Sequence, residues 1–137
     1  MSMELERLRL FNDQFALSWA VTAGDVIYVA GMTGMVVNFG APEVTEFTFP
    51  DTLEEQMRQC YRNIGWILEA VGSALTDVAD QTVFFRGDPA VASAANKVVR
   101  EEVFGARGPA SAMVGVANLH HPDCLLEMKA VAYRGAG

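Results

Sequence analysis

The acidic side chain with the most unusual surroundings is Glu127, which lies in an apolar run near the C-terminus, LLEMKAVAY. A carboxylate among apolar neighbours can position or deprotonate a water molecule, so Glu127 is the first candidate for an acid–base group. The alternative is that Glu127 pairs with a neighbouring cation or backbone group. Lys129, two residues later on the same strand face, either pairs with Glu127 or a ligand, or forms part of a solvated rim.

Two histidines precede this run in the segment NLHHPDC. His120 and His121 are suited to acid–base work at the rim of a cleft, although residues before Pro122 are equally typical of a plain turn. No Cys-x-x-Cys or His-x-x-x-His spacing occurs, so we expect no metal site. Cys60 and Cys124 are expected to be free thiols of a reducing compartment, with a single disulfide as the alternative.

Composition limits the classes of function. The 137 residues are 51% hydrophobic and 20% charged, which is typical of one folded domain, here residues 1–137. No apolar run approaches the roughly 20 residues that span a bilayer, and no secretory signal is visible, so we expect a cytoplasmic protein without a membrane partner. The net charge of −7 and the scattered basic residues argue against a nucleic-acid partner.

The elements that must position these groups follow from hydrophobic periodicity and turn chemistry. They are two short strands within 15–30, an irregular stretch over 35–49, a helix over 53–71, a strand over 78–86, a helix over 89–104, and strands over 110–117 and 125–133. Thr52 and Asp88 are the expected N-caps, and Gly72 the residue that ends the first helix. Gly31 and Gly34 indicate a β-bulge or a place where a ligand closely approaches the backbone.

This order predicts an α+β layer with both helices on one sheet face. The second helix is expected to bury a face that includes Val91 and Val98. Strand alternation directs Leu126, Met128, Ala130 and Ala132 toward the helices, and leaves Met113, Leu125, Val131 and Tyr133 on the opposite, apolar face. An uncovered apolar face predicts self-association, with a partly solvated monomer face as the alternative.

Three stretches carry a resemblance to a known family: AGDVIYVAGMTG, NIGWILEAVGSALTDVADQTVFF and GPASAMVGVANLHHPDCLLEMKAVAYR. They resemble the RidA (YjgF, or L-PSP endoribonuclease-like) family over about residues 15–134, and the ending looks most like its aminomuconate-deaminase branch. The resemblance implies a chorismate-mutase-like α+β fold, a mixed sheet with two helices on one face, and a homotrimer with clefts between subunits. It also implies hydrolysis of reactive enamines or imines without a cofactor or metal.

Only some of the site residues that the resemblance implies are present at the corresponding positions of this sequence. In the family an arginine that binds the substrate carboxylate follows a proline by two positions, and here Pro109-Ala110 is followed by Ser111. The further positions that depart from the family pattern are Leu17 for a tyrosine, Ala30 for a serine and Met113 for a cysteine. Gly31, Asn96 and Glu127 are kept.

The chemistry then needs a group for the substrate carboxylate, a group for water and a proton for the leaving amine. Glu127 is the catalytic candidate, and Ser111 offers a neutral hydrogen bond in place of an ion pair. Arg107 either replaces the cation or is a surface residue, and Trp19 with Phe15 either lines the pocket or packs in the core. We therefore expect a small-molecule ligand other than a small 2-imino acid; the alternatives are a non-catalytic binding or sensing trimer and, weakly, RNA cleavage.

Overall fold

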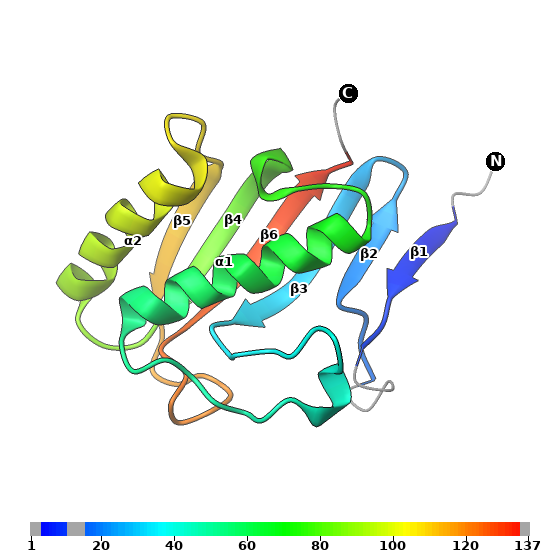
Figure 1. Cartoon of the computed structure of the whole chain (residues 1–137). Coiled ribbons are helices and arrows are strands. Elements are labelled where there is room, and N and C mark those ends of the chain that lie inside the picture. The colour runs from blue at the N-terminus through cyan, green and yellow to red at the C-terminus, as the bar shows by residue number, and fades with distance from the viewer. Residues whose placement is uncertain (1–3, 11–15, 135–137) are drawn as a thin grey trace.

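The computed structural model describes residues 4–10 and 16–134 (Figure 1). The strands are β1 (Leu5–Leu8), β2 (Ala20–Ala23), β3 (Val26–Thr33), β4 (Val78–Phe85), β5 (Ala110–Gly115) and β6 (Leu126–Tyr133). The helices are α1 (Leu53–Ala70) and α2 (Pro89–Phe104), and two single 3-10 turns, η2 (Pro42–Val44) and η3 (Leu75–Asp77), lie in the connections.

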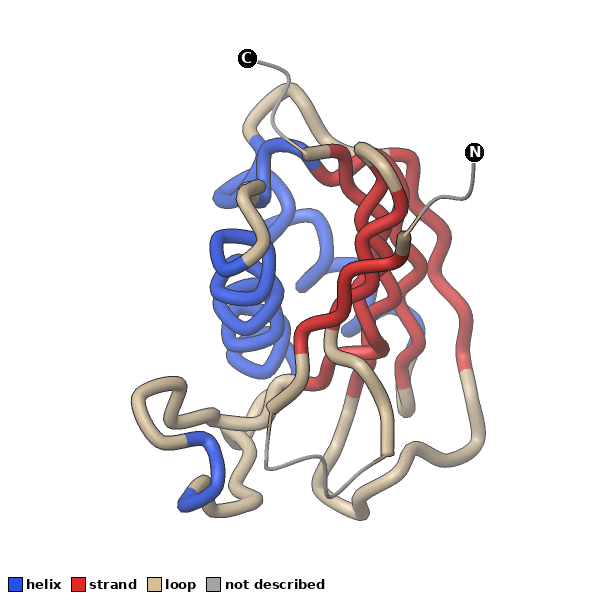
Figure 2. The backbone as a smooth tube through the Cα atoms, turned by 90° about the vertical axis from the view of Figure 1, so that its right-hand side faces the viewer, coloured by secondary structure: helices blue, strands red, loops and turns tan. Residues whose placement is uncertain are grey.

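The six strands form one mixed sheet in the order β1-β2-β3-β6-β4-β5. Only the β4–β5 pair is parallel among these neighbours, since α2 connects the two strands as a crossover. Both helices cover the same face of the sheet, as Figure 2 shows edge-on. The predicted α+β layer with two helices on one face is therefore confirmed.

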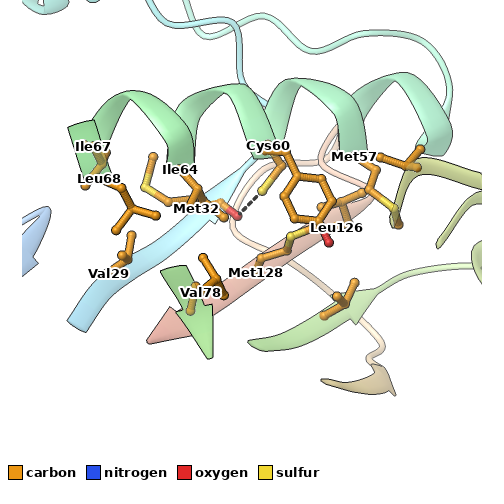
Figure 3. Close-up of a cluster of buried hydrophobic side chains, with 14 of the residues drawn as sticks. Val29, Met32, Met57, Cys60, Ile64, Ile67, Leu68, Val78, Leu126 and Met128 are labelled. Carbon is orange, nitrogen blue, oxygen red and sulfur yellow. Dashed lines mark hydrogen bonds between the residues drawn. The ribbon is translucent and has the colours of Figure 1, made fainter. Parts of the chain in front are cut away.

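The core forms where the apolar stripe of α1 packs on β3 and β6 (Figure 3). Ile64 and Leu68 of α1 lie against Val29 and Met128 of the sheet, and all four are 1% exposed or less. Burying one such side chain contributes about 1.5–3 kcal/mol. This stripe fixes the distance between the helix layer and the sheet.

The helix ends follow the local sequence signals. The Thr52 side chain accepts a hydrogen bond from the Glu55 N–H at 3.2 Å, and the Asp88 side chain accepts one from the Ala90 N–H at 2.8 Å. At the other end of α1, the Ser73 N–H donates to the Leu68 carbonyl and Gly72 has φ +85°, a Schellman cap. Both predicted N-caps and the predicted Gly72 stop are confirmed.

Strand β1 was not expected from the charged N-terminal sequence. It pairs with β2, which is shorter than the predicted strand, and Leu17 lies before β2 rather than within it. Phe15, the start of the predicted strand, lies outside the described residues. The first three residues of this edge strand are all exposed and it contains no apolar run, so only its pairing with β2 identifies it.

The buried face of α2 differs from the prediction at two positions. Val91 and Val98 are 55% and 44% exposed, whereas Ala92 and Asn96 are buried. The helix packs against α1, and the small buried residues Ala92 and Ala95 permit the two helices to approach closely. The predicted face included valines that are exposed, and the buried face of α2 contains smaller and polar residues in their place.

The prediction that Met113 of β5 lies on the uncovered face of the sheet was wrong. Ser111 pairs with Gln81 and Met113 with Val83, and Gln81 and Val83 are buried on the helix side. Ser111 and Met113 therefore face the helices, and Ala112 and Val114 face the uncovered side. The alternation in β6 is as predicted, since Leu126, Met128, Ala130 and Ala132 are all buried.

The uncovered face of the sheet carries apolar and charged side chains together, since exposed Asp80 and Lys129 lie beside Val131. Tyr28 pairs with Val131 across β3 and β6, and Tyr28 and Tyr133 are 48% and 52% exposed. The run Val26–Ala30, predicted to be buried on both faces, alternates instead between a covered and an open face. No described helix covers this face, which can be followed in Figure 2.

Candidate functional site

A cavity of about 430 Å³ lies at the end of the sheet where β3 ends and β6 begins. The connections over 34–52 and 116–125 lie at this same end of the molecule (Figures 1 and 2). Most of its lining is apolar, and the lining residues are Leu17, Trp19, Gly31, Met32, Thr33, Met35, Val37, Phe47, Phe49, Asn63, His120, His121, Cys124 and Glu127.

Glu127 lies directly over Gly31 in this cavity. A Cβ built on Gly31 would be 3.1 Å from Cδ and 3.2 Å from Oε2 of Glu127. The register between β3 and β6 shifts between Val29 and Met32, so Gly31 sits in the bulge that the sequence predicted. The absence of a side chain at Gly31 is therefore what lets the Glu127 carboxylate lie against the strand.

Lys129 is engaged by the same bulge. Its ammonium donates a hydrogen bond to the Val29 carbonyl. Desolvation lowers the pKa of Lys129, because the neighbouring sheet removes part of the water around the ammonium. Lys129 therefore binds the backbone of β3 and is not among the residues that line the cavity.

His121 enters the cavity with its ring orientation fixed. The Asp123 N–H donates to Nδ1 of His121 at 3.1 Å, and the ring packs on Phe49 with centroids 4.9 Å apart. Nδ1 is therefore the accepting nitrogen in this arrangement, and Nε2 is the ring nitrogen left to donate. His120 also lines the cavity but is exposed.

The histidine loop is held by two long polar side chains. Gln56 of α1, 1% exposed, donates to the Asp123 carbonyl at 2.9 Å and accepts from the Leu125 N–H at 2.8 Å. From the end of β4, Arg86 donates to the carbonyls of Cys124 and Pro122. The loop position therefore depends on the helix layer and the sheet together.

The end of β3 is fastened to α1 in a similar way. Asn63 is buried, and its amide donates to the carbonyls of Thr33 at 3.0 Å and Met35 at 2.8 Å. Gly34 lies so close to α1 that a Cβ would be 2.4 Å from the Gln56 carbonyl oxygen. Gln56 and Asn63 were not among the predicted site residues, although two amides within the apolar stripe of α1 were a signal of buried polar contacts.

The two cysteines are free and buried. Cys60 donates to the Met32 carbonyl and Cys124 to the Leu126 carbonyl, each at 3.1 Å (Figure 3 shows the first). Burial raises the pKa of Cys124 to about 11 and raises that of Cys60 still further. Although Cys124 lines the cavity, its thiol is therefore kept in the protonated, weakly nucleophilic form near neutral pH.

Residues 12–134 match the family model described as endoribonuclease L-PSP. The chain belongs to this family, also known as YjgF or RidA. It is 36% identical over 117 residues to a RutC family protein of Pyrococcus abyssi, with 85% of each chain covered. It is 30% identical over 105 residues to a 2-iminobutanoate/2-iminopropanoate deaminase of Dermatophagoides farinae, covering 74% of this chain and 73% of that one.

The solved structures agree with this family. RidA from the Antarctic bacterium Psychrobacter sp. PAMC 21119 superposes with a TM-score of 0.72 at 29% identity, covering 85% of this chain and 87% of that one. Because the match extends over nearly the whole of the described sheet, the RidA-like fold holds for the layer that positions the cavity.

In this RidA family member the predicted site residues divide between two places. Glu127, Gly31, Leu17 and Trp19 line the cavity, together with both histidines. Ala30 does not line it, but its N–H donates to the Trp19 carbonyl at 2.9 Å and so joins β3 to the segment before β2.

The other predicted site residues lie on the helix side of the sheet edge. Ser111 accepts a hydrogen bond from Gln81 at 3.1 Å, and the Asn96 amide contacts the Met113 sulfur at 3.2 Å. Arg107 is exposed in the turn after α2, where its N–H donates to the Phe104 carbonyl. Within one chain, none of these four lines the cavity that contains Glu127.

Within residues 4–10 and 16–134, no group of three or more His, Cys, Asp or Glu side chains is placed to hold a metal ion. No helix in that part of the chain is long and apolar enough to cross a membrane.

Proposed function

We propose that this RidA family member hydrolyses an enamine or imine in the cavity that contains Glu127. The observation that carries the proposal is the Glu127 carboxylate lying over Gly31 in a mostly apolar cavity. The deaminase named among its relatives supports the reaction class. The reaction requires no cofactor or metal, because a polarised C=N bond is attacked by water directly.

In the proposed mechanism Glu127 orients a water molecule and accepts its proton as the oxygen bonds to the imine carbon. This gives a carbinolamine. A proton then moves to its nitrogen, the C–N bond breaks, and a carbonyl compound and ammonia leave. His121, whose Nδ1 is already used by the Asp123 N–H, lines the same cavity and can donate to the leaving nitrogen through Nε2.

The proposed substrate is not a small 2-imino acid. Ser111 occupies the place of the family's arginine and already accepts a hydrogen bond from Gln81. Leu17 and Met113, at two further positions, are apolar where the family pattern is polar. These changes reduce the capacity to hold a substrate carboxylate, since a neutral hydrogen bond contributes roughly half of what a charge-assisted one does.

We also propose that the chain, as one domain, forms a cytoplasmic homotrimer with its clefts between subunits. The exposed apolar face around Tyr28, Val131 and Tyr133 supports an assembly that covers it. In such an assembly Ser111 or Arg107 of one subunit can approach the cavity of another. Sedimentation at micromolar concentration tests the trimer, and a monomer of 14.9 kDa would contradict it.

The test of the reaction uses imines generated in situ. A dehydratase supplies 2-aminoacrylate, and a flavin amine oxidase acting on 2-phenylethylamine supplies a larger imine without a carboxylate, while the timed appearance of the keto acid or the aldehyde measures hydrolysis. We expect acceleration of the larger imine, and loss of most of it in Glu127→Gln. Glu69→Gln, an exposed carboxylate at the end of α1, is the matched control. No acceleration of either imine would reject the proposal.

The alternative function is non-catalytic binding or sensing of a small apolar metabolite. The replacement of the arginine position by Ser111 favours it, because a binding site needs no anchored reacting group. Saturable binding of such a ligand without turnover of any imine would support this alternative. RNA cleavage is disfavoured by the net charge of −7, and we propose no nucleic-acid or membrane partner.

A further inference from the structure

A second hollow adjoins the cavity that contains Glu127. It is lined by Arg7, Arg9, Ala16, Leu17 and Ser18. Leu17 also lines the cavity itself, so the two spaces share one wall, which is the segment that precedes β2. Arg7 belongs to β1, the edge strand of the sheet (Figure 1). The hollow therefore extends the cavity toward this edge.

Two arginines bring positive charge to this hollow. Leu8, which lies between them in the chain, packs on the core, so strand alternation directs Arg7 and Arg9 to the opposite side. Both are exposed, and Arg7 donates a long hydrogen bond of 3.5 Å to the Leu5 carbonyl. A guanidinium has several N–H donors in a planar fork, so a contact within the chain leaves donors for a ligand. That fork matches the two oxygens of a carboxylate.

The shared wall offers further hydrogen-bond donors. Ala16 has φ +49°, in the left-handed region, and residues held in this conformation gather at ligand sites. Successive N–H groups beside such a residue form a concavity that suits an anion. Among residues 4–10 and 16–134, none accepts a hydrogen bond from the N–H of Leu17 or Ser18, or from the Ser18 hydroxyl. These groups are therefore open to solvent or to a ligand.

The two spaces together fit a ligand whose carboxylate lies away from the reacting carbon. Glu127 lines the cavity, whereas Arg7 and Arg9 line the hollow beyond Leu17. A carboxylate on the imine carbon would lie close to the Glu127 carboxylate, and like charges repel. A carboxylate several bonds away reaches the arginines and gains charge-assisted hydrogen bonds.

We propose that the hollow of Arg7 and Arg9 binds a carboxylate of the ligand, set several bonds from the imine carbon that reacts at Glu127. The imine part rests on the proposed function, whereas the carboxylate part rests on the hollow and its donors. The ligand class is therefore an elongated imino or enamino acid with its acidic group and its reacting group at opposite ends. Arg7 and Arg9 are binding residues and take no part in breaking the C–N bond.

Two pairs of stable probes test the carboxylate and its distance: 5-phenylpentanoate with its amide, and 2-phenylacetate with its amide. We expect the ring to occupy the cavity, whose lining is mostly apolar, and the longer acid to extend into the hollow. Calorimetry measures the affinity of each probe. The backbone N–H resonances of Leu17 and Ser18 report whether the acid binds in the hollow, and they should shift with the longer acid.

We expect 5-phenylpentanoate to bind about tenfold more tightly than its amide, because charge-assisted hydrogen bonds are stronger than neutral ones. The short pair should differ by less than about twofold. Arg7→Gln should lower the affinity for the longer acid about threefold, and the variant with both Arg7→Gln and Arg9→Gln about tenfold, with the amides changed by less than about twofold. Arg62→Gln is the matched control, because exposed Arg62 of α1 lines neither space.

Four results would overturn the proposal: the longer acid binds no more tightly than its amide, the short acid shows the same preference, the double arginine variant keeps the full affinity for the longer acid, or no probe binds at millimolar concentration. The probes contain no imine, so they separate the two proposals. If the longer acid binds as expected and no imine is hydrolysed, the carboxylate site stands and the reaction fails. If imines are hydrolysed and the arginine variants do not change acid binding, the reaction stands and the carboxylate site is wrong.

Discussion

Gly31 and Gly34 provide a test that separates the site from the fold. In Gly31→Ala the new Cβ would meet the Glu127 carboxylate at 3.1–3.2 Å, tighter than ordinary contact, so the carboxylate must move by a few tenths of an ångström. Gly31 is not among the positive-φ glycines, so alanine fits its backbone. The perturbation therefore falls on Glu127 and not on the strand.

The expected loss of activity follows from the size of this displacement. A misplacement of about 1 Å costs about 10²-fold in rate, so a shift of roughly a third of that should lower kcat/KM about three- to tenfold. Stability should change by less than about 1 kcal/mol, because alanine replaces a flexible glycine without backbone strain. The rate of imine hydrolysis and urea denaturation measure the two effects on the same sample.

Gly34→Ala is the matched control. Its Cβ would lie 2.4 Å from the carbonyl oxygen and 2.7 Å from Cα of Gln56, which are backbone atoms of α1 and cannot turn aside. We expect a loss of about 2–3 kcal/mol or more in the free energy of unfolding. The reasoning is refuted if Gly31→Ala retains the full rate, or if it destabilises the protein as much as Gly34→Ala does.

Three further predictions concern stability and are measured by urea denaturation. Gln56→Leu should cost about 2–4 kcal/mol, because it leaves the Leu125 N–H and two carbonyls without their buried partner; a loss below about 0.5 kcal/mol would contradict this. Asp88→Ala should cost about 1 kcal/mol through the lost N-cap, with exposed Val91→Ala as a near-neutral control. Burial raises the pKa of Cys124 from 9.0 to about 11, so the contribution of its protonated thiol to the free energy of unfolding is complete below pH 9 and is lost as the pH rises toward 11. Cys124→Ala should therefore reduce the loss of stability between pH 9 and 11. An unchanged dependence of stability on pH would exclude this thiol as the source.

The local sequence signals were sufficient for much of the fold. Thr52, Gly72 and Asp88 act within one helical turn of their own position, so their capping roles need no knowledge of the tertiary structure. The alternation Leu126, Met128, Ala130, Ala132 also assigns the covered face of β6, because large and small apolar residues repeat at a period of two. Glu127 stood out for the same reason, as a charge within that apolar strand.

The orientation of β5 could not be read in this way. Its residues are small or apolar on both sides, so the segment itself carries no contrast between a covered and an open face. The parallel pairing with β4 decides it, since Gln81 and Val83 direct Ser111 and Met113 toward the helices. That parallel pairing exists because α2 connects the two strands as a crossover. No residue within β5 indicates which strand it pairs with.

The sequence by itself determined the helices with their caps, the main strands, the bulge at Gly31 and the acidic group of the site, because each depends on neighbours a few residues away. Only the tertiary structure decided that Trp19, Phe49, His121 and Glu127 line one cavity while Ser111 lies on the other side of the sheet. A cavity lining is assembled from chain segments that are far apart in sequence. Its membership is set by sheet order and by long-range bonds such as those of Gln56, which no local pattern encodes.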